Sequence, residues 1–571
     1  SPDSGVYCEQ SGFTLRGVLH AEAFEQAWRR LIERHDILRT RIEWEGLAQP
    51  VQVLVDAGQA LPHIEHVDLR GYAPNQRSRE LEAYLEADRL RGFDFTKAPI
   101  MRFALIQLEE DQYQFVWTFH HLLLDGWSNP IVIQEFFALY QALSTGGKAE
   151  GVELEPVRPF RDYIDWLHKQ DKNAASGFWT RYLDGIEAPT PLPLERSSGV
   201  APSYRELHLH LNETETAELQ AFARSHQLTL NVIVQGAWAL LLSRYSGESD
   251  VVFGSTVSGR PADLEGVETM VGLFINTLPV RAQLPADATV LEWLRQLQAE
   301  QIEQRQYEYA ALSQIQGWSE VPHGTPLFDS LIVYENYPIQ VTVSESDAMR
   351  EASTTANTES ADSDLELLDI RTFEQTNYSI TLSVVPGEQL DLSIGFDPGR
   401  YAEPAIGRML EHLQLLLRQL SAAPQRELGK VPMLTEAEQE LLYEWNATEA
   451  EYPQQTVHEL IDRQAKQTPD ATALVTEAET LTYRELNARA NQLARYLQEQ
   501  GLGPEMLVGI CAERSPELAV AILGVLKAGG AYVPLDPAYP KERLAYMIKD
   551  AEMSFLLTQD RLTASLPDHA A

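Results

Sequence analysis

The sequence predicts an α/β protein, because strand-like and helix-like stretches alternate along the chain. Residues 112–119, "QYQFVWTF", are rich in β-branched and aromatic side chains, which is typical of a buried strand. Residues 21–38 have helical periodicity instead. Their apolar side chains on one face are Phe24, Trp28, Leu31 and Ile32. Helical periodicity returns at 131–143, where Pro130 stands near the first turn and is tolerated there.

The elements that follow keep this alternation. In chain order we expect a loop at 146–159, a short helix at 160–170, an apolar helix at 229–247, a strand running into a glycine loop at 250–260, and a strand pair at 378–397 that turns at Pro386-Gly387. The stretch 341–364 is polar, acidic and poor in aromatic residues, and it predicts a mobile surface insertion.

Composition limits the possible functions. The chain has 571 residues, which suggests about three or four domains. Its 45 basic and 84 acidic residues give a net charge of −39, so nucleic acid and anionic membranes are poor partners. Cys8 and Cys511 stand far apart and predict no disulfide framework, which favours a reducing, cytoplasmic compartment. Neither a membrane-spanning apolar run nor a metal-ligand spacing is evident.

The chain divides near residue 426. A linker with one short helix is expected there, and a second α/β pattern begins near Thr456. The first residues, "SPDSGVYCEQ", include no methionine and do not resemble a signal peptide, so we expect the chain to start inside a longer protein.

The stretch "HHLLLDG" is the strongest candidate for chemistry. It lies between the strand at 112–119 and the helix at 131–143. Because neighbouring side chains of an extended segment point apart, one of His120 and His121 can face inward while the other faces a channel. We expect Asp125 to cap the turn or to pair with a distant arginine, and Gly126 to allow a backbone conformation that a Cβ atom would oppose. A histidine pair alone is more often inert; the whole pattern after a strong strand is more specific.

The same stretch resembles the HHxxxDG signature of nonribosomal peptide synthetase condensation domains, which are relatives of CoA-dependent acyltransferases. Four further segments resemble elements of that family in the family's order: "RHDILRTRI" at 34–42, "FRDYIDWL" at 160–167, "VGLFINTLPVR" at 271–281 and "TPLFDSLIVYENYP" at 325–338. The family's first motif would lie before Ser1, and its HQDYPF-like element is matched only loosely at 303–315.

The end of the chain has its own resemblance. Residues 481–497 and 526–544 resemble the first two core motifs of amino-acid-activating adenylation domains. The phosphate-binding loop that follows in that family does not occur before the chain ends. We therefore expect no aminoacyl adenylate to be made by this part.

The resemblance implies a domain plan. Two chloramphenicol-acetyltransferase-like lobes, at 1–175 and 176–425, would form a V around a central tunnel. A linker at 426–455 would lead to the truncated N-terminal part of an adenylation domain at 456–571.

The resemblance also implies a reaction and its site. The amine of an acceptor aminoacyl thioester would attack a donor aminoacyl or peptidyl thioester, with His121 as the catalytic residue, either as a base or as a positioning group. His120, Asp125 and Gly126 would support the loop. Arg39 and Arg281 are candidates to pair with Asp125 or to line the tunnel, and Asn276 could line it or cap a strand.

No cofactor is expected on the chain itself, and no metal. Phosphopantetheine arms would come from partner carrier domains, and ATP with Mg²⁺ would matter only for a complete adenylation domain. The expected partners are an upstream donor carrier, a downstream acceptor carrier and the rest of the adenylation domain, with neither nucleic acid nor membrane.

Other functions stay open. The chain could be a catalytically silent platform that docks carriers, or a domain that joins a fatty acyl donor at the start of synthesis. Epimerisation is disfavoured because no additional catalytic Glu-Gly-His motif is found, and heterocyclisation because His120 and His121 replace its DxxxxD pattern. A serine hydrolase is disfavoured because no GxSxG elbow is present.

Overall fold

The computed structural model describes residues 7–194, 204–335, 365–477 and 479–568, so the predicted insertion at 341–364 lies outside the described residues. The chain forms two compact units, Ser1–Tyr443 and Glu444–Ala571. Among the described residues, no helix has the length and apolar character needed to cross a bilayer.

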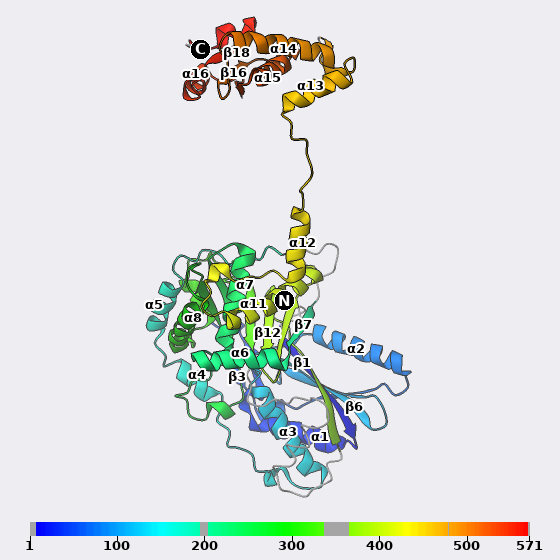
Figure 1. The fold of residues 1–571 in the computed structure, drawn as a ribbon. Helices are drawn as coiled ribbons and strands as arrows, with labels where there is room; N and C mark the ends of the chain where they lie inside the picture. Colours follow the sequence, from blue (N-terminus) through cyan, green and yellow to red (C-terminus); the bar gives the residue numbers. More distant parts are fainter. Residues whose placement is uncertain (1–6, 195–203, 336–364, 478, 569–571) are drawn as a thin grey trace. The chain divides into compact units, whose positions relative to one another are not determined.

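The first sheet of the larger unit has five strands. In spatial order they are β11 (Leu365–Phe373), β1 (Cys8–Gly17), β6 (Gln112–His120), β5 (Met101–Gln107) and β4 (Ile64–Asp68). Neighbours run antiparallel except for β4 and β5, which are parallel. The helices α1 (Ala21–Arg34) and α3 (Ser128–Ser144) pack on this sheet (Figure 1). The strand and both helices predicted for this region are confirmed.

The packing between this sheet and its helices is aromatic. Trp28 of α1 is fully buried. The centre of its ring lies 4.4 Å from the ring centre of Phe103 and 4.9 Å from that of Phe136. The helix ends at Arg34, earlier than the sequence pattern suggests, and a short 3₁₀ turn follows at Asp36–Arg39.

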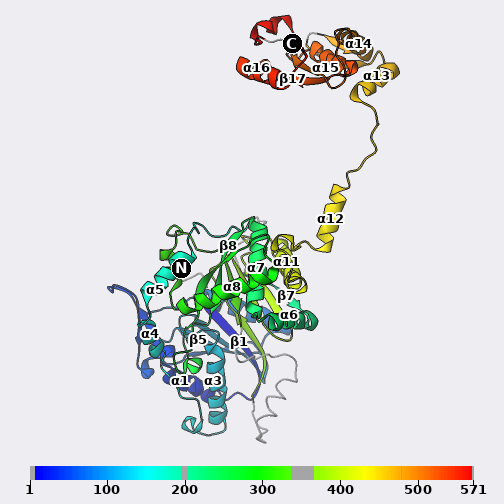
Figure 2. The same ribbon diagram turned by 60° about the vertical axis from the view of Figure 1, so that its left-hand side comes forward.

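The second sheet has six strands. Their spatial order is β7 (Arg205–Leu211), β13 (Leu390–Phe396), β12 (Ile380–Val385), β10 (Ser330–Tyr334), β8 (Asp250–Val257) and β9 (Asn276–Gln283). The helices packed in its apolar core are α6 (Glu213–His226), α7 (Leu230–Ser246), α8 (Val290–Gln304) and α11 (Glu403–Ala422) (Figure 2). The predicted apolar helix, the strand after it and the strand pair at 378–397 are confirmed, the last as the antiparallel pair β12 and β13.

One strand joins distant parts of the chain. Although β11 follows β10 in sequence, it pairs with β1 in the first sheet. The first sheet therefore contains residues from both predicted lobes. The lobe and linker limits at 175, 425 and 455 stay predictions.

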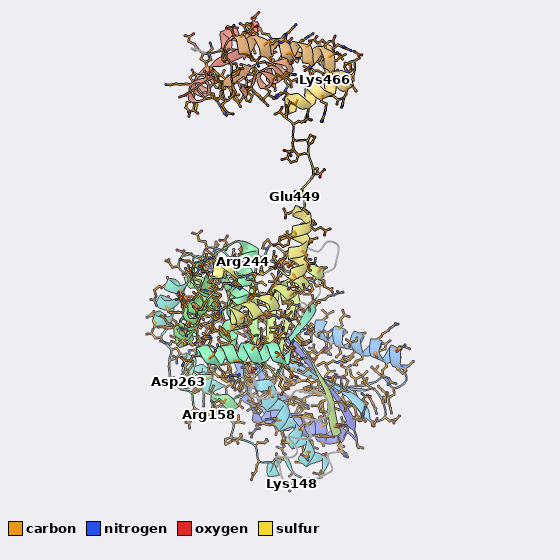
Figure 3. The ribbon with its side chains drawn as sticks, viewed as in Figure 1. Lys148, Arg158, Arg244, Asp263, Glu449 and Lys466 are labelled. Atoms are coloured by element: carbon orange, nitrogen blue, oxygen red, sulfur yellow. The ribbon has the colours of Figure 1, made fainter. Side chains whose placement is uncertain are left out.

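The helix α7 illustrates why the sequence folds as it does. The Thr229 hydroxyl accepts a hydrogen bond from the Val232 amide at the start of the helix, and Gly247 ends it with a φ angle of 79°. Arg244, labelled in Figure 3, donates to the Leu428 carbonyl (2.9 Å), which ties α7 to the segment after α11.

The remaining elements of the larger unit are short or peripheral. They are β2 (Thr40–Glu43), β3 (Val51–Leu54), α2 (Pro74–Leu90), α4 (Arg161–Leu167), α5 (Lys172–Tyr182), α9 (Leu312–Trp318) and α12 (Glu436–Asn446). The short helices predicted at 160–170 and in the linker correspond to α4 and α12.

The smaller unit is also α/β. Its elements are α13 (Val457–Gln467), β14 (Thr472–Val475), β15 (Thr480–Thr482), α14 (Tyr483–Glu499), β16 (Leu507–Cys511), α15 (Pro516–Ala528), β17 (Ala531–Pro534), α16 (Lys541–Asp550) and β18 (Phe555–Thr558). The strands β17, β16 and β18 form a parallel sheet. Thr482 and Glu485 form a capping box that starts α14.

Candidate active site

A large cavity of the larger unit has a volume of about 1750 Å³. Side chains of β1, β6 and β11 in the first sheet line it, together with side chains of β7, β12 and β13 in the second sheet. Both histidines of the HHLLLDG stretch line it. The predicted channel thus corresponds to a real cavity, while the predicted tunnel open at two ends stays a prediction.

Strand alternation selects which side chains face this cavity. On β1 and the residue before it, every second side chain lines the cavity: Tyr7, Glu9, Ser11 and Phe13. On the neighbouring β11, Ile370 and Thr372 line it, followed by Glu374. Ser11 lies opposite Thr372 and Phe13 opposite Ile370, so the same register places Glu9 across from Glu374. Two carboxyl groups therefore lie on the same wall, beside the end of β6.

His121 follows β6 directly and completes this wall. Its amide donates to the Tyr7 carbonyl (2.9 Å), which continues the pairing of β6 with the start of β1. The imidazole Nδ1 lies 2.7 Å from the Leu124 carbonyl oxygen. Because a carbonyl can only accept, Nδ1 carries a hydrogen and Nε2 is the nitrogen available for acid–base chemistry.

Two carboxylates surround Nε2 of His121. Its distance is 3.2 Å to Glu9 Oε1 and 3.8 Å to Glu374 Oε1. Burial opposes a charge on the imidazole, but the charges of Glu9 and Glu374 outweigh it and raise the pKa of His121 above its ordinary value. Burial also raises the pKa of Glu9, against the opposing effect of His121. The two groups are coupled, and each keeps its proton to a higher pH than it would alone in water.

His120 has a different environment. Its Nδ1 accepts a hydrogen bond from the Leu122 amide (3.1 Å), and its ring lies edge-on to that of Phe95, with ring centres 4.9 Å apart. Burial, with a smaller contribution from His121, lowers the pKa of His120 to about 4. His120 is thus a neutral, packed ring that also lines the cavity, and the two histidines are not divided into one facing inward and one facing the channel.

Asp125 shapes the loop in both of the ways expected from the sequence: it caps the turn, and it pairs with a distant arginine. Its Oδ1 accepts hydrogen bonds from the Ser128 amide (2.9 Å) and hydroxyl (2.7 Å), which closes the turn that leads into α3. Its Oδ2 accepts from the Phe274 amide (3.0 Å), so this side chain also binds a segment 149 positions away.

The arginine that pairs with Asp125 is Arg260, not Arg39 or Arg281. Arg260 Nη2 lies 3.2 Å from Asp125 Oδ1, and the two side chains are only 4% and 0% exposed. Arg281 pairs with Asp250 at 2.7 Å, and Arg39 pairs with Asp36. Neither Arg39 nor Arg281 lines the cavity. The prediction for these two arginines was wrong, because each has an acidic partner in its own neighbourhood.

Two further predictions have mixed outcomes. Asn276 lines the cavity, and its amide donates to the carbonyls of Glu308 and Ala310 (2.7 Å each) at the start of β9. Gly126 also lines the cavity, but it is not among the described glycines with a positive φ angle, so the expected backbone reason for it was wrong. Gly272, whose amide donates to the Ser128 hydroxyl, is under steric constraint, because a Cβ atom there would lie 2.2 Å from Phe160 Cδ2.

Four residues of the site were not predicted: Glu9, Ser128, Arg260 and Glu374. Ser128 could have been found as the residue three positions after Asp125, at the start of the predicted helix. Glu9 could have been noticed as an acidic residue inside an otherwise strand-like segment. Arg260 and Glu374 had no local signal, because only the tertiary fold brings them to the loop.

Glu9, His121 and Glu374 also form the one group of described residues whose ligand atoms, all within 4.8 Å of one another, could hold a cation. A histidine and two carboxylates are compatible with a divalent metal in general. The expectation that the reaction uses none stays a prediction.

The fold and the site define an α/β protein with a buried histidine in the wall of a large cavity. Residues 1–443 match the Condensation domain family, and residues 461–571 match the AMP-binding enzyme family. The chain belongs to the condensation domain family of nonribosomal peptide synthetases, followed by the start of an adenylation domain.

Among its curated relatives are subunits C and B of linear gramicidin synthase from Brevibacillus parabrevis. They are 49% and 47% identical over 573 and 572 residues, which is 99% of this chain in both cases. The chain spans only 7% and 11% of those two proteins.

Structural relatives have the same fold. A crystal structure of the nonribosomal peptide synthetase FmoA3 with AMPPNP bound has a TM-score of 0.79 at 23% identity, over 99% of this chain and 57% of that one. The starter condensation domain of rhizomide synthetase RzmA, in complex with C8-CoA, has a TM-score of 0.59 at 18% identity, over 76% and 94%.

Proposed function

We propose that the larger unit forms an amide bond between two carrier-bound thioesters, with His121 as the catalytic residue. The observation that carries the proposal is the fixed imidazole: the Leu124 carbonyl holds Nδ1, and His121 lines a cavity of about 1750 Å³. A cavity of this size can hold two acyl groups together with the ends of their phosphopantetheine arms.

The chemistry follows from what the site offers. An α-amino group with a pKa near 7.7–8.0 is partly protonated at neutral pH and must lose a proton before or during attack. Nε2 of His121 can hold the amine in place and accept that proton. His120, Asp125 and Arg260 keep the loop in the required shape without touching the reacting atoms.

The partners follow from the same reaction. The donor and acceptor arrive on phosphopantetheine arms of two carrier domains, and the adenylation domain of which residues 461–571 are the start would use ATP and Mg²⁺ to activate an amino acid. A cytoplasmic location stays a prediction from the cysteine usage.

The test is a single-turnover assay with separately loaded carriers. Aminoacyl, peptidyl and fatty acyl donors are each offered with one aminoacyl acceptor, and the product on the acceptor carrier is followed by intact mass. Product from aminoacyl or peptidyl donors supports the proposal, and product from fatty acyl donors alone supports the initiation function. Carrier binding without product from any donor would identify a docking platform and overturn the proposal.

A further inference from the structure

The strand β7 (Arg205–Leu211) is an edge strand of the second sheet. Its one partner among the described residues is β13, and none of them makes a backbone hydrogen bond to its other side. An edge of this kind presents a row of unpaired N–H and C=O groups, which is a template for pairing with another extended chain. The free edge of β7 is therefore a binding capacity that the described part of the fold does not use.

This edge borders the cavity. Every second side chain of β7 and of the residue before it lines the cavity: Tyr204, Glu206, His208 and His210. The leucines between them pack on the apolar core of the second sheet. The exposed side-chain fraction rises from 35% at Glu206 to 59% at His208 and 60% at His210. The strand thus leads from the interior of the cavity toward solvent.

The start of β7 lies near the candidate active site. The ring of Tyr204 packs at 78° against that of Phe373, with ring centres 5.5 Å apart. Phe373 directly precedes Glu374, whose Oε1 lies 3.8 Å from Nε2 of His121. A chain that extends from the reacting carbonyl at His121 can therefore reach the edge of β7 at its first residues.

The direction of β7 fits a peptide attached at its C-terminus. Arg205, at the site end, is paired through Phe396 of β13 with Ile380 at the start of β12, and Leu211 lies at the far end. The strand therefore runs away from the site. A peptidyl thioester has its reacting carbonyl at the C-terminus, so its chain would leave His121 in the opposite sense. Beside β7 it would be antiparallel, which is the more stable kind of pairing.

We infer that the free edge of β7 binds the peptide of a peptidyl donor as an added antiparallel strand, through backbone hydrogen bonds. This inference rests on the proposed function and deepens it, because it names the part of the donor that is recognised. The seven residues of β7 span about 20 Å, which gives room for about five residues of peptide. Because the backbone is the same in every peptide, this mode of binding accepts donors of different sequence.

The test uses the loaded-carrier assay at limiting donor concentration. The donors are peptides of about the length that β7 can pair, with an aminoacyl donor as the internal control. In an antiparallel pair every second residue exchanges both backbone hydrogen bonds with its partner, and the residues between them point away. A single N-methyl group is therefore moved along the peptide, one residue at a time, starting at the second residue from the thioester.

The inference predicts an alternating pattern. N-methylation should slow product formation by about tenfold at every second position, because it removes a hydrogen bond and places a methyl group against β7. At the positions between, the same modification should slow the reaction by less than about twofold. The unmethylated peptide should react about tenfold faster than the aminoacyl donor.

Proline variants connect this pattern with β7. Neighbouring amides of a strand point to opposite sides, so one of His208 and Leu209 donates toward β13 and the other toward the free edge. Of His208→Pro and Leu209→Pro, the edge-directed variant keeps its unfolding midpoint closer to that of the wild type. It should slow the peptidyl donor about tenfold more than the aminoacyl donor. His66→Pro is the matched control, because β4 is an edge strand that does not line the cavity.

An even effect of N-methylation along the peptide would overturn the inference, as would no effect at any position. An aminoacyl donor that reacts as fast as the peptides would overturn it too. If both proline variants of β7 fail to fold, the methylation pattern decides alone. A wild type that forms product without the alternating pattern contradicts this inference and leaves the proposed function standing. The proposed function fails separately, if no donor gives an amide product.

Discussion

Asp125 and Arg260 form a buried ion pair across the larger unit, with Arg260 Nη2 3.2 Å from Asp125 Oδ1. Asp125 belongs to the loop of His121, whereas Arg260 follows β8 of the second sheet. The same carboxylate accepts hydrogen bonds from the Ser128 amide at the start of α3 and from the Phe274 amide. The position of His121, the proposed catalytic residue, thus depends on contacts with segments next to the second sheet.

Removing the charge of Asp125 should destabilise the larger unit. Asp125→Asn leaves the buried guanidinium of Arg260 without a counter-charge, and we expect a loss of about 3–5 kcal/mol in the free energy of unfolding. Denaturant unfolding followed by intrinsic tryptophan fluorescence measures it. The control is Glu109→Gln, whose 56% exposed carboxylate pairs with Arg77 and should contribute less than about 1 kcal/mol. Equal effects of the two substitutions would refute this role of the pair.

Gly272 should tolerate no side chain. In Gly272→Ala the new Cβ would lie 2.2 Å from Phe160 Cδ2, and relieving the overlap shifts a segment that hydrogen-bonds Ser128. We expect a loss of about 1–3 kcal/mol in the free energy of unfolding. A Cβ atom at Gly407 in α11 would have no neighbouring atom within 4 Å outside its own helix backbone, so Gly407→Ala should stabilise the protein by roughly 0.5–1 kcal/mol. An unchanged free energy of unfolding in Gly272→Ala would contradict the expected overlap between the new Cβ atom and Phe160.

His120 should make the larger unit less stable in mild acid. Its pKa is about 4 in the folded protein, below the ordinary value near 6.5 in the unfolded chain. Between these values the unfolded state binds the extra proton, so stability falls as the pH is lowered from about 6.5 to about 4. Protonation would also break the hydrogen bond from the Leu122 amide to Nδ1.

The measurement is the unfolding midpoint at pH 7 and pH 5 in the wild type and in His120→Leu, which keeps an apolar group against Phe95. The decrease at pH 5 should be smaller in the variant. A decrease of the same size in both proteins would assign the acid sensitivity to other groups.

Metal removal should leave condensation unchanged. The proposed chemistry needs a proton acceptor at His121, and this role does not require a cation. The rate of the loaded-carrier assay is compared before and after dialysis against EDTA. A loss of activity that added Zn²⁺ restores would show that Glu9, His121 and Glu374 hold a metal instead.

The sequence supported predictions wherever the signal was local. The aromatic strand before His120, the helix periodicity around Trp28 and the alternation of the strand pair at 378–397 each depend on residues a few positions apart. The turn-capping role of Asp125 could be predicted for the same reason, because its hydrogen-bond partner Ser128 is only three residues away.

The site's other contacts depend on the tertiary fold. Arg39, Arg281 and Arg260 all stand in strand- or loop-like segments, and no local pattern tells which of them reaches Asp125. Glu374 meets Glu9 only because β11 leaves the order of the chain and joins β1. A long-range pairing of this kind has no signature in the periodicity of a single sequence.

The most direct test of the central claim is the single-turnover rate of dipeptidyl-carrier formation at neutral pH by the wild type and His121→Ala. With an imidazole that holds the amine and accepts its proton, the variant should be about 10²- to 10⁴-fold slower at unchanged carrier binding. Equal rates in the two proteins would contradict the assignment of His121 as the catalytic residue.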